Sequence, residues 1–117
     1  MKSIIKIVAI VIVSTLALSA QNQNKNAVTT FKVKGMCEMC KARIEAAAYV
    51  KGVKMVTWDK HTGDIKVYYN PEKTDPLLVQ KSIAEAGHDT EAVQASIEAY
   101  QNLPACCQYK SGTIHKH

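Results

Sequence analysis

The chain has 117 residues, of which 47% are hydrophobic and 21% charged, and its formal net charge is +5. This length accommodates one compact domain with short accessory segments. The basic residues form no run of five or six and no aromatic residues are interleaved with them, which argues against nucleic-acid binding. The sequence contains no glycine-rich phosphate loop, H-E-x-x-H motif or serine-elbow motif, so we expect a protein that is not an enzyme.

The first 20 residues have the anatomy of a secretory signal peptide. Two lysines precede an uncharged apolar run over residues 7–18, and small residues close it. A membrane-spanning helix requires about 20 apolar residues, so we expect cleavage and no stable membrane insertion afterwards, with an uncleaved anchor as the alternative. The mature protein is then periplasmic or secreted, in a compartment where disulfides can persist.

Residues 28–93 predict six elements in the order β-α-β-β-α-β. Alternating runs rich in β-branched residues indicate strands, and apolar residues at i, i+4 and i+7 indicate helices. We expect strands at 28–34, 53–59, 64–70 and 88–93, a first helix from Glu38 that Gly52 stops, and a second helix that Asp75 caps, Pro76 starts and Gly87 closes. The fold class is α+β: a ferredoxin-like βαββαβ sandwich with two helices on a four-stranded antiparallel sheet.

Two further segments flank this domain. Residues 21–27 are polar and are expected to form a flexible linker after the signal peptide. Residues 94–117 form a C-terminal extension, with a short helix predicted at 94–102 and a Cys/His tail, ACCQYKSGTIHKH, after it. The predicted division is therefore a signal peptide at 1–20, a linker at 21–27, a domain at 28–93 and an extension at 94–117.

The stretch GMCEMCKARIE places Cys37 and Cys40 where the first strand ends and the first helix begins. A helix N-terminus exposes unpaired N–H groups and carries partial positive charge, and both favour a thiolate over a thiol. Two thiolates at i and i+3 can face one ion, and they suit Cu(I) as well as Zn(II), Hg(II) or Cd(II). Two ligands leave the ion open to an incoming ligand, as a carrier requires, whereas structural zinc takes four.

Two other interpretations of the pair stay open. A C-x-x-C near a βαβ pattern is also typical of a thioredoxin-like redox dithiol, and an exported protein can use two cysteines as a structural disulfide. The predicted hairpin and the lack of an obvious resolving residue argue against the redox dithiol. The small loop argues against the structural disulfide, because closing it removes little chain entropy. We favour a metal site.

The domain resembles the heavy-metal-associated family of copper chaperones, metal-ATPase N-terminal domains and periplasmic mercury-binding proteins. VKGMCEMCKARIEAA resembles the family motif G-M-x-C-x-x-C with an apolar residue four positions on, here Ile44. GVKMVTWD, GDIKVYYNP and LLVQKSIAEAGHD resemble its second strand, third strand and second helix. The resemblance spans Val28–Val93 and implies a ferredoxin-like fold with Cys37 and Cys40 as metal ligands.

Two positions depart from the family pattern. Met36 directly precedes Cys37, whereas the family usually has one residue between them, so Met36 is either a thioether ligand for Cu(I) or, like Met39, a packing residue. His88 follows A-G where relatives often carry tyrosine, phenylalanine or lysine near the metal loop. His88 is either a third ligand or pH-sensitive tuner of the site, or an exposed loop residue.

The tail adds further candidate ligands. Cys106 and Cys107 either join Cys37 and Cys40 in a cluster for zinc or multinuclear Cu(I), or form a vicinal disulfide or a redox partner for the first pair. The two tail histidines, His115 and His117, are expected to be disordered, with a weak tail site as the alternative, and His61 is expected to be a plain turn residue.

These patterns together predict an exported soft-metal-binding protein, a Cu(I) chaperone or scavenger that passes its ion by thiolate exchange. Mercury or another toxic cation is the alternative ion, and a periplasmic thiol–disulfide oxidoreductase is the alternative class. The expected partner is a metal-transporting membrane protein or another metallochaperone, with Lys41 and Arg43 guiding docking to an acidic face.

Overall fold

The computed structural model of the protein describes residues 26–110. The predicted signal peptide at 1–20, most of the linker, His115 and His117 lie outside the described residues. Within the described part, no helix is long and apolar enough to cross a membrane.

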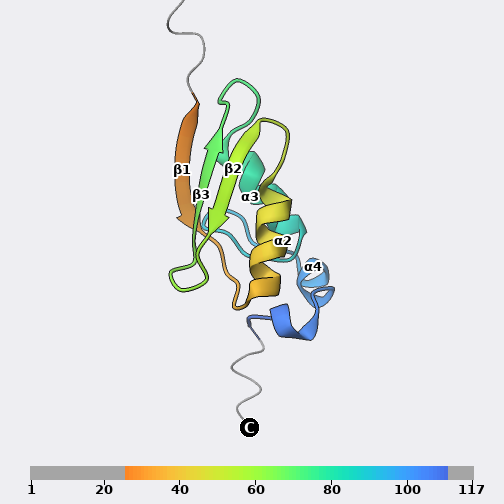
Figure 1. Cartoon of the computed structure of the whole chain (residues 1–117). Helices are drawn as coiled ribbons and strands as arrows, with labels where there is room; N and C mark the ends of the chain where they lie inside the picture. The colour runs from red at the N-terminus through yellow and green to blue at the C-terminus, as the bar shows by residue number, and fades with distance from the viewer. Residues whose placement is uncertain (1–25, 111–117) are drawn as a thin grey trace, which may run out of the picture.

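The described chain forms three strands, two longer helices and two short helical segments (Figure 1). In chain order these are β1 (Ala27–Lys32), α2 (Glu38–Ala48), β2 (Val53–Trp58), β3 (Asp64–Tyr69), α3 (Pro76–Glu85), α4 (Ile97–Gln101) and the 3-10 turn η1 (Ala105–Cys107). Three of the four predicted strands, both helices of the domain and the short helix of the extension are therefore present, with ends that differ by a few residues.

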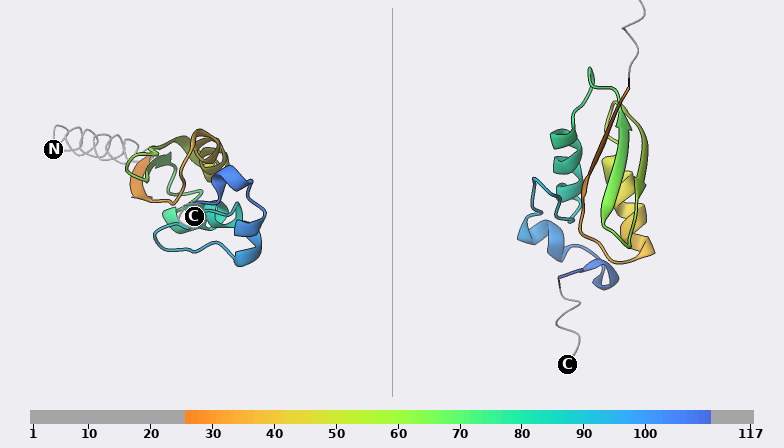
Figure 2. Two further views of the ribbon diagram at one scale, coloured as in Figure 1. Left: turned by 90° about the horizontal axis from the view of Figure 1, so that it is seen from below. Right: turned by 90° about the vertical axis from the view of Figure 1, so that its left-hand side faces the viewer.

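The three strands form one antiparallel sheet in the order β1-β3-β2. Ile65 of β3 pairs with Phe31 of β1 on one side and Trp58 of β2 on the other, and all three are buried. Residues of the opposite face, such as Lys66 and Thr57, are exposed. The alternation predicted from the sequence is confirmed: one face of the sheet carries the core, and α2 and α3 cover it side by side (Figure 2).

The helix boundaries follow local backbone chemistry. The Asp75 carboxylate accepts a hydrogen bond from the Leu78 N–H at 3.0 Å, and Pro76 occupies the first turn, so α3 begins as predicted. Helix α2 ends at Ala48, before the predicted stop. Gly52, at φ +100°, instead belongs to the turn that leads into β2.

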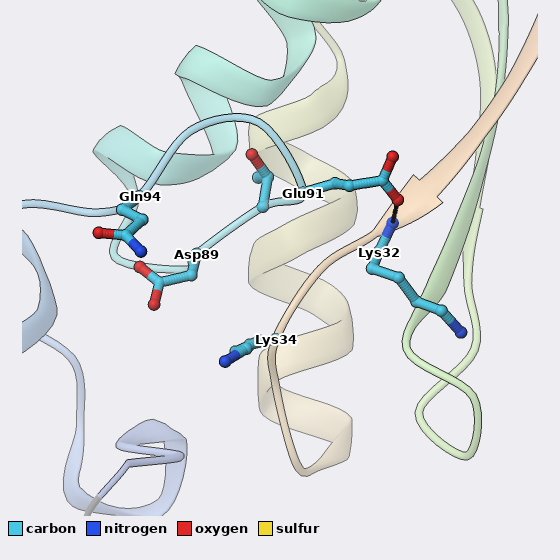
Figure 3. A pocket seen from close by; sticks show the side chains of 6 residues that line it. Lys32, Lys34, Asp89, Glu91 and Gln94 are labelled. Atoms are coloured by element: carbon cyan, nitrogen blue, oxygen red, sulfur yellow. Dashed lines mark hydrogen bonds between the residues drawn. The ribbon is translucent and has the colours of Figure 1, made fainter.

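The prediction of a fourth strand at 88–93 is not confirmed, because the segment makes only one isolated antiparallel bridge, between Val33 and Thr90. Beyond Thr90 the chain turns back on itself. The Thr90 N–H donates to the Val93 carbonyl at 2.8 Å, and the Gln80 side-chain oxygen accepts from the Thr90 hydroxyl and the Ala92 N–H. The backbone N–H groups of Thr90 and Ala92 and the Val93 carbonyl are thus engaged in a turn, and pairing stops after one residue. Figure 3 shows the neighbouring Glu91 carboxylate accepting the Lys32 backbone N–H.

The extension packs into the core of the domain. Leu103 is 4% exposed, Cys107 is fully buried, and both belong to the same cluster as the sheet residues. Gly87 makes this docking possible, since a Cβ there would lie 2.8 Å from both the Ala99 carbonyl oxygen and Leu103 Cγ. As a result α4 and η1 lie at the end of the molecule where α2 begins (Figures 1 and 2).

We predict that Gly87→Ala destabilises the protein by about 1–3 kcal/mol more than Gly63→Ala. Both glycines have positive φ, so both variants introduce backbone strain. A Cβ at Gly63, however, would contact only the Val33 carbonyl oxygen, at 3.4 Å. Urea unfolding of the two variants measures the difference. Equal losses would show that the extension does not press against Gly87.

Candidate metal centre

The loop between β1 and α2 is held against the core at Gly35. A Cβ at this position would lie 2.9 Å from Ile44 Cδ1, 3.0 Å from Trp58 Cη2 and 3.1 Å from Cys40 Cβ. Glycine therefore allows the loop backbone to approach the core more closely than any other residue would permit. This approach brings the loop onto the first turn of α2, which Cys37 precedes as its N-cap residue.

A polar clamp fixes the orientation of α2 beside the sheet. The Glu45 carboxylate accepts hydrogen bonds from the Trp58 backbone N–H at 2.9 Å and from the Lys41 ammonium at 2.8 Å. Lys41 also donates to the Trp58 carbonyl at 2.8 Å. The Lys41 ammonium is used internally and the Arg43 Nε atom is buried, while both side chains stay partly exposed, and their role in docking stays a prediction.

Three thiols meet at the N-terminal end of α2. The Sγ atoms of Cys37, Cys40 and Cys107 all lie within 4.8 Å of one another. Cys37 Sγ is 3.3 Å from Cys40 Sγ and 3.8 Å from Cys107 Sγ, and all of these cysteines are free. Metal–sulfur bonds of about 2.3 Å place neighbouring ligand sulfurs roughly 3.8–4.0 Å apart. The three sulfurs are thus spaced closely enough to hold one ion with small side-chain adjustments.

The protonation states of these thiols differ because their surroundings differ. Burial raises the pKa of Cys37, but the backbone N–H and thiol of Cys40, the thiol of Cys107 and the backbone N–H of Met39 outweigh it and set the pKa below its ordinary value. This lowering of the Cys37 pKa is in the direction expected for a cysteine at the start of α2. Burial and the neighbouring sulfurs raise the pKa of Cys107 to about 12. Without an ion, Cys107 is therefore a thiol that donates toward its sulfur neighbours.

The two tail cysteines differ in their surroundings. Cys107 is fully buried in the cluster, whereas Cys106 is exposed at its edge. Cys106 Sγ lies 3.9 Å from Cys107 Sγ and 3.4 Å from the thioether sulfur of Met39. The sequence left open whether the tail reaches the first pair, and the structure brings it there.

Met36, by contrast, is 47% exposed, and no hydrogen bond of the described residues joins it to a cysteine. Met39, which was expected to be a packing residue, is the methionine beside the cysteines. It lies in the first turn of α2, the helix that η1 contacts.

His88 is fully buried rather than an exposed loop residue. Its Nδ1 atom lies 2.7 Å from the Lys34 carbonyl oxygen, its ring stacks on Tyr109 with centroids 5.5 Å apart, and it does not belong to the group of three thiols. Burial holds the pKa of His88 below its ordinary value. The Lys34 contact partly opposes this shift, and the Arg43 charge adds to it.

Tyr109 fastens the extension beneath the site. Its hydroxyl accepts from the Asp89 backbone N–H at 2.8 Å and donates to the Gly87 carbonyl at 3.1 Å. The Lys110 ammonium lies 3.2 Å from the buried Asp89 carboxylate. These contacts anchor the chain just after Cys107, and the buried Leu103 anchors it before, so the Cys107 sulfur is placed by the fold rather than by a loose tail.

Three solved structures share this architecture. CopZ metallochaperone is 24% identical, covers 55% of this chain and 98% of its own, and has a TM-score of 0.53. Oxidised MerP from Ralstonia metallidurans CH34 is 26% identical over 57% of this chain and 96% of its own, with a TM-score of 0.54. A copper-binding domain from HMA7, a P-type ATPase, is 26% identical over 55% and 89%, with a TM-score of 0.53.

These neighbours are heavy-metal-associated domain proteins, and this chain shares their fold. The resemblance proposed from the sequence is thereby confirmed at the level of structure. No protein-family model matches the chain, and no curated protein does. The coverage of 55–57% is close to the length of the domain alone, so the similarity concerns the domain and not the whole chain.

We predict that alkylation distinguishes the thiols in the reduced, metal-free protein. Because the pKa of Cys37 is lowered, Cys37 should react with iodoacetamide at a lower pH than an ordinary thiol, since the thiolate is the nucleophile. Cys107 should stay unlabelled until the protein unfolds, being buried with a raised pKa. Peptide mapping by mass spectrometry across pH measures both. Faster labelling of Cys107 than of Cys37 would contradict the arrangement.

We also predict that acid destabilises the protein through His88. The unfolded histidine takes up a proton near pH 6.5, before the folded one does, so the unfolded state binds more protons and stability falls as pH drops through that value. His88→Phe keeps a ring against Tyr109 but cannot titrate, and its stability should change less with pH between about 7 and 5. Urea unfolding at several pH values provides the test, and parallel curves for the two proteins would reject it.

Proposed function

We propose that this protein is an exported soft-metal carrier that takes up Cu(I) as a chaperone or scavenger and passes it on by thiolate exchange. The observation that carries the proposal is the meeting of three thiols within 4.8 Å at the start of α2. Similarity to a copper-binding domain, at 26% identity, supports it. The predicted signal peptide supports export, into the periplasm or outside the cell.

In this mechanism the chain offers a graded set of ligands. Cys37 is half-buried and predisposed to the thiolate, so it meets the ion first. Cys40 and Cys107 are fully buried and complete the coordination once Cys107 releases its proton. Transfer to a partner is also stepwise. A thiolate of the partner binds the ion beside Cys37, and the sulfurs of this chain then dissociate from the ion one at a time.

Three thiolates favour Cu(I) over zinc, because structural zinc takes four protein ligands while soft, low-coordinate Cu(I) does not require a fourth. Hg(II) and Cd(II) are equally thiophilic, and toxic-cation binding is the alternative within the same class. The partner we propose is a metal-transporting membrane protein or another metallochaperone, in keeping with the P-type ATPase domain among the structural neighbours. We propose no enzymatic activity.

A thiol–disulfide oxidoreductase is the alternative from a different class. Cys107, which the sequence offered as one possible redox partner, is near enough to act as a resolving thiol, since its Sγ lies 3.8 Å from Cys37 Sγ. Cys107 is nevertheless a poor nucleophile, because its pKa of about 12 leaves almost no thiolate near neutral pH. The geometry therefore suits ligation better than exchange.

We predict that the full chain, reduced and kept anaerobic, retains Cu(I) against bathocuproine disulfonate. Cys37→Ser and Cys40→Ser should each lower the affinity of the thiol cluster by at least about tenfold, because each removes a ligand from it. Cys107→Ser should weaken binding by a similar factor. Competition titration followed by metal analysis measures the effect, with Zn(II) and Hg(II) titrated in parallel.

The matched control is His61→Asn, which alters an exposed turn residue and should bind as the wild type does. Reduction of insulin by the metal-free chain tests the oxidoreductase class. Failure of all three ions to bind, with insulin reduced, would overturn the carrier and establish the alternative.

A further inference from the structure

The sulfur cluster continues past the thiols of Cys37, Cys40 and Cys107. Cys106 Sγ lies 3.9 Å from Cys107 Sγ, and Met39 Sδ lies 3.4 Å from Cys106 Sγ. The sulfurs therefore form one continuous row, in the order Cys40, Cys37, Cys107, Cys106 and Met39, with distances of 3.3–3.9 Å between neighbours. A single ion can use only part of this row.

Cys107 lies in the middle of the row, with a thiol on either side. A thiolate sulfur has more than one lone pair and can bridge two soft ions. Cys107 can therefore complete a first site with Cys37 and Cys40 and contribute to a second with Cys106. The spacing on the two sides is nearly equal, at 3.8 Å and 3.9 Å, which is close to the roughly 3.8–4.0 Å between sulfurs that share an ion.

Met39 completes the outer side. Its side chain is 53% exposed, so burial gives little reason for it to lie on Cys106, which is itself exposed. Met36 and Met55 are similarly exposed, at 47% and 54%, and no hydrogen bond of the described residues joins either to a cysteine. A thioether is a soft, uncharged ligand suited to Cu(I), whereas structural zinc sites use thiolate, imidazole and carboxylate ligands.

We propose that Cys106, Cys107 and Met39 form a second Cu(I) position that shares the Cys107 sulfur with the first, so that one chain carries two copper ions. The inference rests on the proposed function and extends it. Two of the three sulfurs of the first position, those of Cys40 and Cys107, are fully buried, whereas the second position lies at the exposed rim. The rim ion is therefore the one that a partner's thiolates reach without any opening of the fold, and it exchanges first.

The test is a competition titration of the reduced full chain with Cu(I) and bathocuproine disulfonate, followed by X-ray absorption of the loaded protein. We expect two retained Cu(I) ions per chain and a copper–copper scattering path. Cys106→Ser should leave one ion, held by Cys37, Cys40 and Cys107, and should remove the copper–copper path.

Met39→Leu keeps the size of the side chain and removes its sulfur. It should weaken the second ion by at least about tenfold and leave the first unchanged. The matched controls are Met36→Leu and Met55→Leu, which alter methionines of similar exposure and should retain both ions at wild-type affinity.

The outcomes separate the two proposals. One retained ion in the wild type, unaffected by Cys106→Ser and Met39→Leu, would overturn the second position while leaving the carrier intact. Retention of no Cu(I) at all would overturn the carrier and the second position together. If Met36→Leu weakened binding of the second Cu(I) ion as much as Met39→Leu does, Met39 would not be its specific thioether ligand. That result would reject the second position as described.

Discussion

The close approach of Gly35 to the core is the constraint on which the site depends. Gly35 belongs to the loop that carries the first cysteine. A Cβ at this position would lie 2.9–3.1 Å from atoms of Ile44, Trp58 and Cys40, so there is no room for a side chain. Because the loop is seated there, Cys37 caps α2 and its sulfur lies beside Cys40. The Lys41–Glu45 clamp then fixes the same helix turn to β2, so sheet and site are positioned by one set of contacts.

Much of the fold could be predicted because its signals are local. Alternation in β1, β2 and β3 and the capping residues Asp75 and Pro76 act within a few residues of the element they specify. The absence of the fourth strand could not be predicted, because it depends on Gln80, which lies ten residues before Thr90 and binds the Thr90 hydroxyl and the Ala92 backbone N–H in a turn. Only tertiary structure brings these residues together.

The same distinction applies to the site. The Cys37–Cys40 pair could be read from its spacing, but the contribution of Cys107 depends on contacts between distant residues. Tyr109 must reach the backbone at Gly87 and Asp89, and Leu103 must enter the core, before the tail sulfur can arrive. His88 illustrates the limit: its place after A-G indicated proximity to the loop, but only the structure shows that its ring supports Tyr109 instead of joining the thiols.

The anchoring of the extension has a thermodynamic consequence. Since Cys107 belongs both to the thiol cluster and to the segment packed on Gly87, an ion bound through its sulfur adds its binding free energy to the docked state alone. The supply of a soft ion that binds there would thereby set how long α4 and η1 stay protected from proteases. The lifetime of that segment would then report how much of the ion is available.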